Sequence, residues 1–153
     1  DVATCSRDDG VDVAARIMRD RDCGIVPVLS SGALVGVITD RDVCLAALAS
    51  GKPLAEIPVS AAMTSSVRCC HAGASLAEAE EVMRTGHVRR LPVVAGGRLV
   101  GLVSIDDIAV AAVRAEGEGL LGGRLDEEEF ARTVDACVRA AGGVPVGETA
   151  GVR

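Results

Sequence analysis

Short apolar runs separated by glycine-containing turns recur along the chain, and the most regular group of them occurs twice. Residues 26–43 and 91–108 each contain two runs rich in Val, Leu and Ile, a turn between them, and a helical pattern afterwards. The offset between the copies is 65 residues throughout, as from Pro27 to Pro92, and no gap is needed. The pattern predicts a β-hairpin followed by a helix in each copy.

The repeat extends backwards to the beginning of the chain, where Met18 matches Met83 and Cys5 matches Cys70. Each copy is therefore one supersecondary unit, whose apolar sheet face is most simply covered by the other copy. We expect an α/β fold of two repeats related by a pseudo-twofold axis. The elements expected are strands at 2–5, 26–29, 34–39, 67–70, 91–94 and 99–104, and helices at 11–18, 40–50, 76–86 and 106–114.

Three short motifs shared by the copies make each resemble a cystathionine β-synthase (CBS) domain, and together a tandem CBS pair, or Bateman module. The motifs are Val26-Pro27-Val28 with Leu91-Pro92-Val93, Leu-Val-Gly in the second hairpin strand, and Thr39-Asp40-Arg41-Asp42 with Ser104-Ile105-Asp106-Asp107. The resemblance implies that each repeat has a small, mainly three-stranded sheet and two helices. The chain is expected to divide into four segments. They are a first repeat at 1–50, trimmed at its N-terminus, a crossover and lead-in to the second repeat at 51–64, a second repeat at 65–114 and a tail at 115–153.

Two hydroxyl–carboxylate pairs are the strongest candidates for a binding site. Thr39 and Ser104 each end a predicted strand and precede a helix, whose free N–H groups and dipole favour an anion. Asp42 and Asp107 follow one helical turn later, where a carboxylate can accept hydrogen bonds from a ribose diol. The same spacing also describes a plain helix cap with no ligand, so the residues alone leave both interpretations open.

The resemblance implies that these four residues hold the ribose and phosphate of an adenosyl ligand in clefts between the repeats. AMP, ADP, ATP, S-adenosylmethionine and NAD are the candidates. The residues implied around adenine are Val37, Leu102, Thr4, Cys69, Val26 and Leu91. The copies diverge where the second has Arg89 and the first has Gly24. A cation at this position favours phosphate, so the two clefts are expected to bind unequally. The alternative is that Arg89 is an ordinary solvated surface residue.

No catalytic arrangement is visible, and we expect a regulatory module rather than an enzyme. His71 and His87 are the only histidines, and neither has a nucleophile or carboxylate partner at a recognisable spacing. A net charge of −6 and a single aromatic residue, Phe130, argue against nucleic-acid binding. No membrane-spanning run or signal peptide is visible, so a cytoplasmic location is expected. Lys52 is the only lysine among many arginines, which suggests a GC-rich bacterial genome.

Six cysteines show no C-x-x-C spacing, and most are expected to be reduced and structural. Cys69, Cys70 and His71 are the exception, because these residue types bind zinc. A metal- or redox-responsive module is therefore the alternative function, and a dimerisation scaffold without ligand is another.

The chain changes character after the second repeat. Residues 115–123 have the composition of a flexible linker, and acidic residues at 126–129 then begin a predicted helix with a narrow apolar stripe. The stripe consists of Phe130, Val134, Cys137 and Val138. It is expected to pack on the chain's own module or on a second copy, or to bind a partner protein. The resemblance adds the expectation of a homodimer and an unidentified effector protein.

Overall fold

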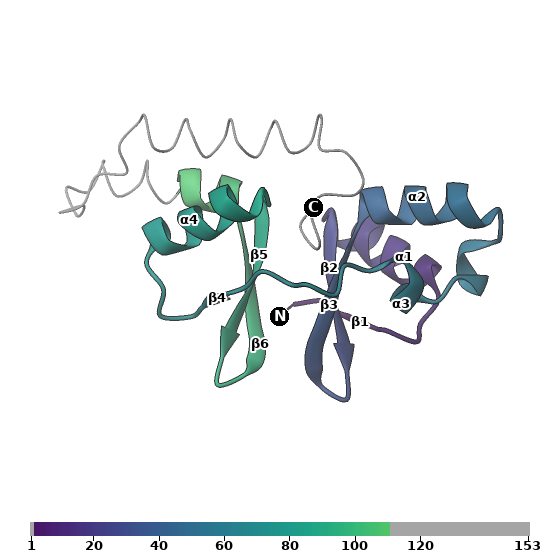
Figure 1. Ribbon diagram of the computed structural model, residues 1–153, viewed down its shortest axis with the longest axis horizontal. Helices are drawn as coiled ribbons and strands as arrows, with labels where there is room; N and C mark the ends of the chain where they lie inside the picture. The colour runs from purple at the N-terminus through teal and green to yellow at the C-terminus, as the bar shows by residue number, and fades with distance from the viewer. Residues whose placement is uncertain (1, 111–153) are drawn as a thin grey trace. The chain divides into compact units, whose positions relative to one another are not determined.

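The structure of the protein is a computed structural model, which describes residues 2–110 in two compact units (Figure 1). The chain passes from the first unit to the second between Val67 and Arg68. The predicted tail at 115–153, and the end of the last repeat helix, lie outside the described residues. No described helix is long and apolar enough to cross a membrane.

The first unit contains a three-stranded mixed sheet in the order β1-β2-β3. Strand β1 runs parallel to β2, and β2 runs antiparallel to β3. Its elements are β1 (Cys5–Ser6), α1 (Val11–Arg21), β2 (Ile25–Ser30), β3 (Ala33–Thr39) and α2 (Asp40–Ser50).

The second unit repeats this order with a sheet β4-β5-β6, in which β4 is parallel to β5. Its elements are β4 (Cys70–His71), α4 (Leu76–Gly86), β5 (Arg90–Ala95) and β6 (Arg98–Ser104), followed by a helix described over 105–110. Two small mixed sheets, each with helices, confirm the predicted fold class.

The entering strands are shorter and begin later than the sequence predicts. Only Cys5 and Ser6 pair with β2, and the corresponding strand of the second unit is Cys70–His71. The chain turns immediately after β1 because the Ser6 amide donates to Asp9 Oδ2 at 2.7 Å. That turn redirects the backbone towards α1 and leaves β1 as a two-residue edge strand.

Both hairpins close through two-residue turns whose residues have positive φ. The first uses Ser31 and Gly32, at 50° and 80°, and the second uses Gly96 and Gly97, at 54° and 76°. Two consecutive positive φ values match the right-handed twist of the flanking strands. The turns thus fix the register that brings β3 and β6 back to their helices.

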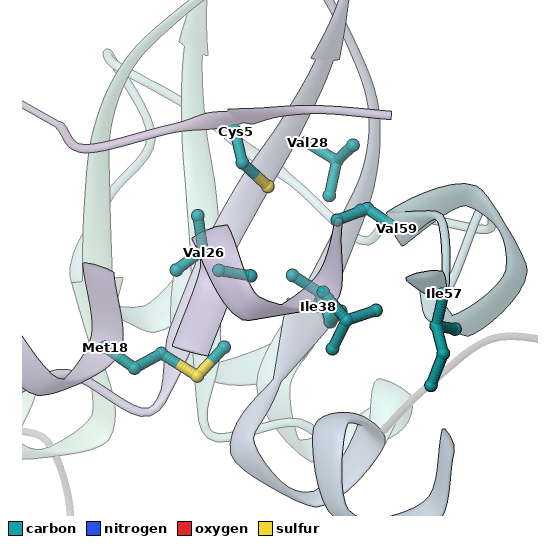
Figure 2. Close-up of a cluster of buried hydrophobic side chains, with 9 residues drawn as sticks. Cys5, Met18, Val26, Val28, Ile38, Ile57 and Val59 are labelled. Carbon is teal, nitrogen blue, oxygen red and sulfur yellow. The ribbon is translucent and has the colours of Figure 1, made fainter. Parts of the chain in front are cut away.

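The core of the first unit lies between the sheet and the helices (Figure 2). Val26 and Val28 come from β2, Ile38 comes from β3, and all three have no exposed surface. The labelled side chains of Figure 2 point into one apolar cluster, to which Cys5 and Met18 contribute sulfur atoms. The second unit has its own cluster, consisting of Cys70, Ala79, Met83, Val88, Leu91 and Ile108.

The segment at 51–64, predicted as the crossover and lead-in to the second repeat, packs on the first unit. It contains a 3-10 turn, η1 (Leu54–Glu56), and a short helix, α3 (Val59–Ala62). The Val11 amide donates to Ile57 O at 2.9 Å, and the Val59 amide donates to Asp9 O at 2.8 Å. Ile57 and Val59 are 6% and 0% exposed, so this segment completes the first core.

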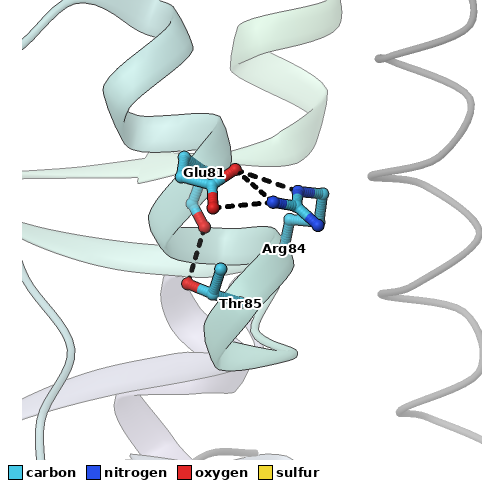
Figure 3. A network of polar contacts seen from close by, with 3 residues as sticks. All are labelled: Glu81, Arg84 and Thr85. Atoms are coloured by element: carbon cyan, nitrogen blue, oxygen red, sulfur yellow. Dashed lines mark hydrogen bonds and ion pairs between the residues drawn. The ribbon is translucent and has the colours of Figure 1, made fainter.

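Helix α4 begins with a capping box formed by Ser75 and Glu78. The Ser75 hydroxyl accepts from the Glu78 amide at 3.2 Å, and Glu78 Oε2 accepts from the Ser75 amide at 2.7 Å. Farther along, the Arg84 guanidinium contacts both carboxylate oxygens of Glu81, and the Thr85 hydroxyl donates to Glu81 O at 2.7 Å (Figure 3). These contacts are exposed, so they define the helix surface and add little stability.

Candidate functional site

The first candidate turn joins β3 to α2 through a complete capping box. Thr39 is the N-cap of α2, and Asp42 is the third residue of its first turn. Asp42 Oδ2 accepts from the Thr39 hydroxyl at 2.7 Å and from the Thr39 amide at 3.0 Å. The Asp42 amide in turn donates to Thr39 Oγ1 at 3.2 Å. Both side chains are half-buried, and these hydrogen bonds hold them in place.

The second candidate turn has the same geometry. Asp107 Oδ2 accepts from the Ser104 hydroxyl at 2.7 Å and from the Ser104 amide at 2.9 Å. The Asp107 amide donates to Ser104 Oγ at 3.2 Å. The structure therefore brings together both hydroxyl–carboxylate pairs that the sequence singles out.

Each carboxylate uses only one of its oxygens in the cap. Within residues 2–110, every hydrogen bond recorded for Asp42 and Asp107 side chains is made by Oδ2. Because an ionised carboxylate has two acceptor oxygens, Oδ1 keeps its acceptor capacity. Capping and ligand binding are thus compatible at each turn: Oδ2 closes the helix, and Oδ1 can accept from a hydroxyl group.

The Ser104 hydroxyl and amide hold the pKa of the Asp107 carboxyl below its usual value. A depressed folded-state pKa gives stability that is present above the unfolded-state pKa, about 4, and is lost as pH falls through the folded value. Ser104→Ala is therefore expected to raise the Asp107 pKa, measured by NMR titration of its carboxyl carbon. The Glu78 carboxyl, whose pKa is lowered by Ser75, is the internal control and should not change. An unchanged Asp107 pKa would contradict the cap geometry.

The backbone carbonyl of Arg89 contacts the second turn. The Ile105 amide donates to Arg89 O at 2.9 Å, immediately after Ser104. In the first unit, the Asp40 amide approaches Gly24 O at 3.4 Å in the matching position. One turn therefore has an exposed arginine next to it, whereas the other has a glycine and an acidic residue, Asp40.

A close backbone approach beside Val37 is a feature that sequence reasoning missed. Val37 and Thr64 exchange two backbone hydrogen bonds, at 3.0 and 2.9 Å. A Cβ added at Gly36 would lie 2.6 Å from Met63 Sδ and 3.1 Å from Thr64 O. A glycine inside a predicted strand is the signal that could have indicated this contact, since such glycines mark close approach of another backbone.

The residues implied around adenine differ in accessibility. Val26 and Leu91 have no exposed surface, so in this structure they belong to the two cores. Val37 is 7% exposed, and Leu102, Thr4 and Cys69 are half-buried. Contact of these residues with a ligand stays a prediction, and the half-buried ones require the least movement to reach it.

The metal alternative receives little support from the described residues. Among residues 2–110, no group of three or more His, Cys, Asp and Glu side chains is placed to hold a metal ion. Burial raises the pKa of both the Cys69 and the Cys70 thiols, which disfavours the thiolate that binds metals. The five described cysteines are free thiols, and Cys137 lies outside the described residues.

Comparison with known proteins shows which family the chain resembles. The family model described as "CBS domain" matches residues 1–49 and 56–114. The CBS domain-containing protein YhcV of Bacillus subtilis is 36% identical over 118 residues, which covers 77% of this chain and 84% of YhcV.

Two similar solved structures contain ligands of different kinds. The CBS domain pair of protein MJ0100, in complex with 5′-methylthioadenosine and S-adenosyl-L-methionine, has a TM-score of 0.65 at 26% identity and covers 78% of this chain and 90% of that chain. Hypoxic Response Protein I with two coordinated zinc ions has a TM-score of 0.65 at 33% identity and covers 71% of this chain and 89% of that chain.

Proposed function

Because this chain belongs to the CBS domain family and contains a tandem pair of these domains, we propose that it is a non-enzymatic sensor of an adenosyl ligand. The pre-formed turns at Thr39–Asp42 and Ser104–Asp107 are the proposed ribose and phosphate sites. The observation that carries the proposal is that Oδ2 of each carboxylate caps the helix, whereas Oδ1 keeps its acceptor capacity. The adenosyl complex of MJ0100 supports this ligand class.

The proposed mechanism is a population shift. A ligand that binds one arrangement of the chain better than another increases the population of that arrangement, by no more than its differential affinity. An attached domain or an effector protein would then respond to the change. A homodimer of this chain is part of the same proposal, and light scattering with and without ligand tests it.

The direct test is thermal unfolding of the chain with AMP, ADP, ATP, S-adenosylmethionine and NAD in turn. A ligand at 100 times its dissociation constant adds about 2.7 kcal/mol to the free energy of unfolding. For a chain of this size, that raises the melting temperature by roughly 5–11 °C. Guanosine and cytidine nucleotides are the matched controls. Equal shifts with every nucleotide, or no shift with any, would contradict the proposal.

Arg89→Ala is expected to weaken phosphorylated ligands and spare adenosine. The side chain is exposed and its backbone carbonyl contacts the second turn, so an arginine there is placed to meet a phosphate. Loss of one charge-assisted hydrogen bond, about 1.5–3 kcal/mol, corresponds to roughly 10- to 150-fold in the AMP dissociation constant. Isothermal titration of AMP and adenosine against Arg89→Ala and the parent measures this difference. Equal loss of both ligands would mean that Arg89 does not bind phosphate.

Zinc binding is the second candidate function, and the zinc-bound relative is the observation in its favour. Metal analysis of protein purified without chelator distinguishes it from the first candidate. Stoichiometric zinc that is lost in Cys69→Ser with Cys70→Ser would establish a metal site. We expect no stoichiometric zinc, because no group of three or more His, Cys, Asp and Glu side chains among residues 2–110 is placed to hold a metal ion.

A further inference from the structure

Met63 packs against the backbone of a glycine in β3. A Cβ added at Gly36 would lie 2.6 Å from Met63 Sδ and 3.2 Å from Met63 Cγ, so the thioether fills the space that a side chain would need. Met63 is half-buried at the edge of the first core cluster. The other two methionines of the chain, Met18 and Met83, are 8% and 0% exposed. Met63 is therefore the methionine that a solute reaches most easily.

The residue after Met63 attaches the end of segment 57–64 to β3. Val37 and Thr64 exchange two backbone hydrogen bonds, at 3.0 and 2.9 Å. Residues 65–66 follow and are exposed, so little packing holds the chain beyond this point. A segment end with few buried contacts is where a fold opens locally. The contact between Met63 and β3 thus lies next to the two hydrogen bonds that close this end.

We propose that Met63 is an oxidation-sensitive switch that controls the attachment of segment 57–64 to β3. A peroxide transfers one oxygen atom to Sδ: the sulfur lone pair forms the S–O bond, the O–O bond breaks, and the remaining oxygen leaves as water or an alcohol. The sulfur loses two electrons and the peroxide gains them. The product is a sulfoxide, which is polar where the thioether was apolar.

The surroundings of Met63 do not suit a sulfoxide. Thr64 O lies 3.1 Å from the Cβ position added at Gly36 and is an acceptor, so it cannot donate to the sulfoxide oxygen. Burial of an acceptor without a partner is costly. The oxidised side chain is therefore expected to leave Gly36 for solvent, and the hydrogen bonds between Val37 and Thr64 are expected to open with it.

The switch also regulates the first candidate turn, and this part rests on the proposed function. Opening of the bonds at Val37 frees one side of β3, the strand that ends at Thr39. Oxidation should then weaken ligand binding at the first turn and spare the second. The second unit has no matching contact among the described residues, because a Cβ added at Gly101 would meet only Val93.

Hydrogen exchange of the full chain, measured without ligand before and after treatment with hydrogen peroxide, tests the switch. The exchange rates of the Val37 and Thr64 amides should rise about tenfold, as expected for the loss of one or two backbone hydrogen bonds. The Val59 amide, which donates to Asp9 O at 2.8 Å, is the matched control and should not change. Methionine sulfoxide reductase should restore the original rates.

Two variants separate Met63 from the cysteines, which peroxide also oxidises. Met63→Leu keeps the apolar contact and every thiol but cannot form a sulfoxide, so peroxide should leave the Val37 and Thr64 rates unchanged. Met63→Gln places a polar group where the sulfur was and should raise both rates about tenfold without peroxide. Circular dichroism checks that each variant is folded.

Four outcomes would overturn the switch. They are oxidation of Met18 or Met83 before Met63 by mass spectrometry, unchanged rates after complete oxidation of Met63, a rise that persists in Met63→Leu, and an equal rise at Val59, which would mean general unfolding. The exchange result does not depend on the proposed function, because no ligand is present. Ligand titration of the oxidised chain tests the regulation separately, and unchanged affinity at the first turn would overturn that part.

Discussion

Asp42→Ala and Asp107→Ala are each expected to remove the ligand-induced stabilisation that arises from their own turn. If both turns bind the ligand, each variant retains part of the shift and the double variant retains none. The reason is that Oδ1 of each carboxylate is the proposed acceptor for a ribose hydroxyl, and a hydrogen bond to a charged group contributes about 1.5–3 kcal/mol. Thermal unfolding at a fixed ligand concentration measures the effect.

Loss of a helix cap complicates this experiment, and the chain provides its own control. Each Asp→Ala variant also breaks a capping box, which costs about 0.5–2 kcal/mol of stability without any ligand. Glu78→Ala breaks an equivalent capping box at α4, outside both candidate turns. It should lower the melting temperature similarly and leave the ligand shift intact. A ligand shift that survives in the double Asp variant would exclude the proposed acceptor role.

Ile38→Ala is expected to lower the free energy of unfolding by about 2–5 kcal/mol, or roughly 4–20 °C in melting temperature. Ile38 has no exposed surface and belongs to the first core cluster, so the truncation leaves a cavity. It also directly precedes Thr39, and the loss of packing should therefore weaken ligand binding at the first turn as well. Chemical denaturation and ligand titration measure the two effects.

Leu48→Ala is the matched control for the core variant, because it removes a side chain of equal size that is 82% exposed. We expect it to change the free energy of unfolding by less than about 0.5 kcal/mol. A cost at Ile38 as small as that at Leu48 would contradict the described core.

The elements that the sequence predicts best are those specified by local chemistry. The range of α2 agrees with the prediction at both ends, because Thr39 caps it and Gly51, at φ 63°, ends it. The two hairpin turns are equally local, since Ser31-Gly32 and Gly96-Gly97 supply the positive φ values themselves. The 65-residue repeat then transfers each local inference from one copy to the other.

The features that the sequence predicts less well depend on contacts between distant residues. Nothing in the pattern of 54–64 indicates that Ile57 and Val59 complete the first core, because an apolar segment between two repeats can pack on either one. The hydroxyl–carboxylate pairs show a different limit. A cap and the proposed ribose site use the same residues at the same spacing, and only the structure shows that Oδ2 makes the cap.

The paired hydrogen bonds between Val37 and Thr64 have a mechanical consequence. Val37 is two residues before the candidate turn at Thr39, and Thr64 lies near the end of the first unit at Val67, with the second beginning at Arg68. The segment that leads to the second unit is thus hydrogen-bonded to β3, the strand that ends at the first candidate turn. If the first turn binds a ligand, as proposed, a displacement of the end of β3 would be transmitted through these hydrogen bonds to Thr64.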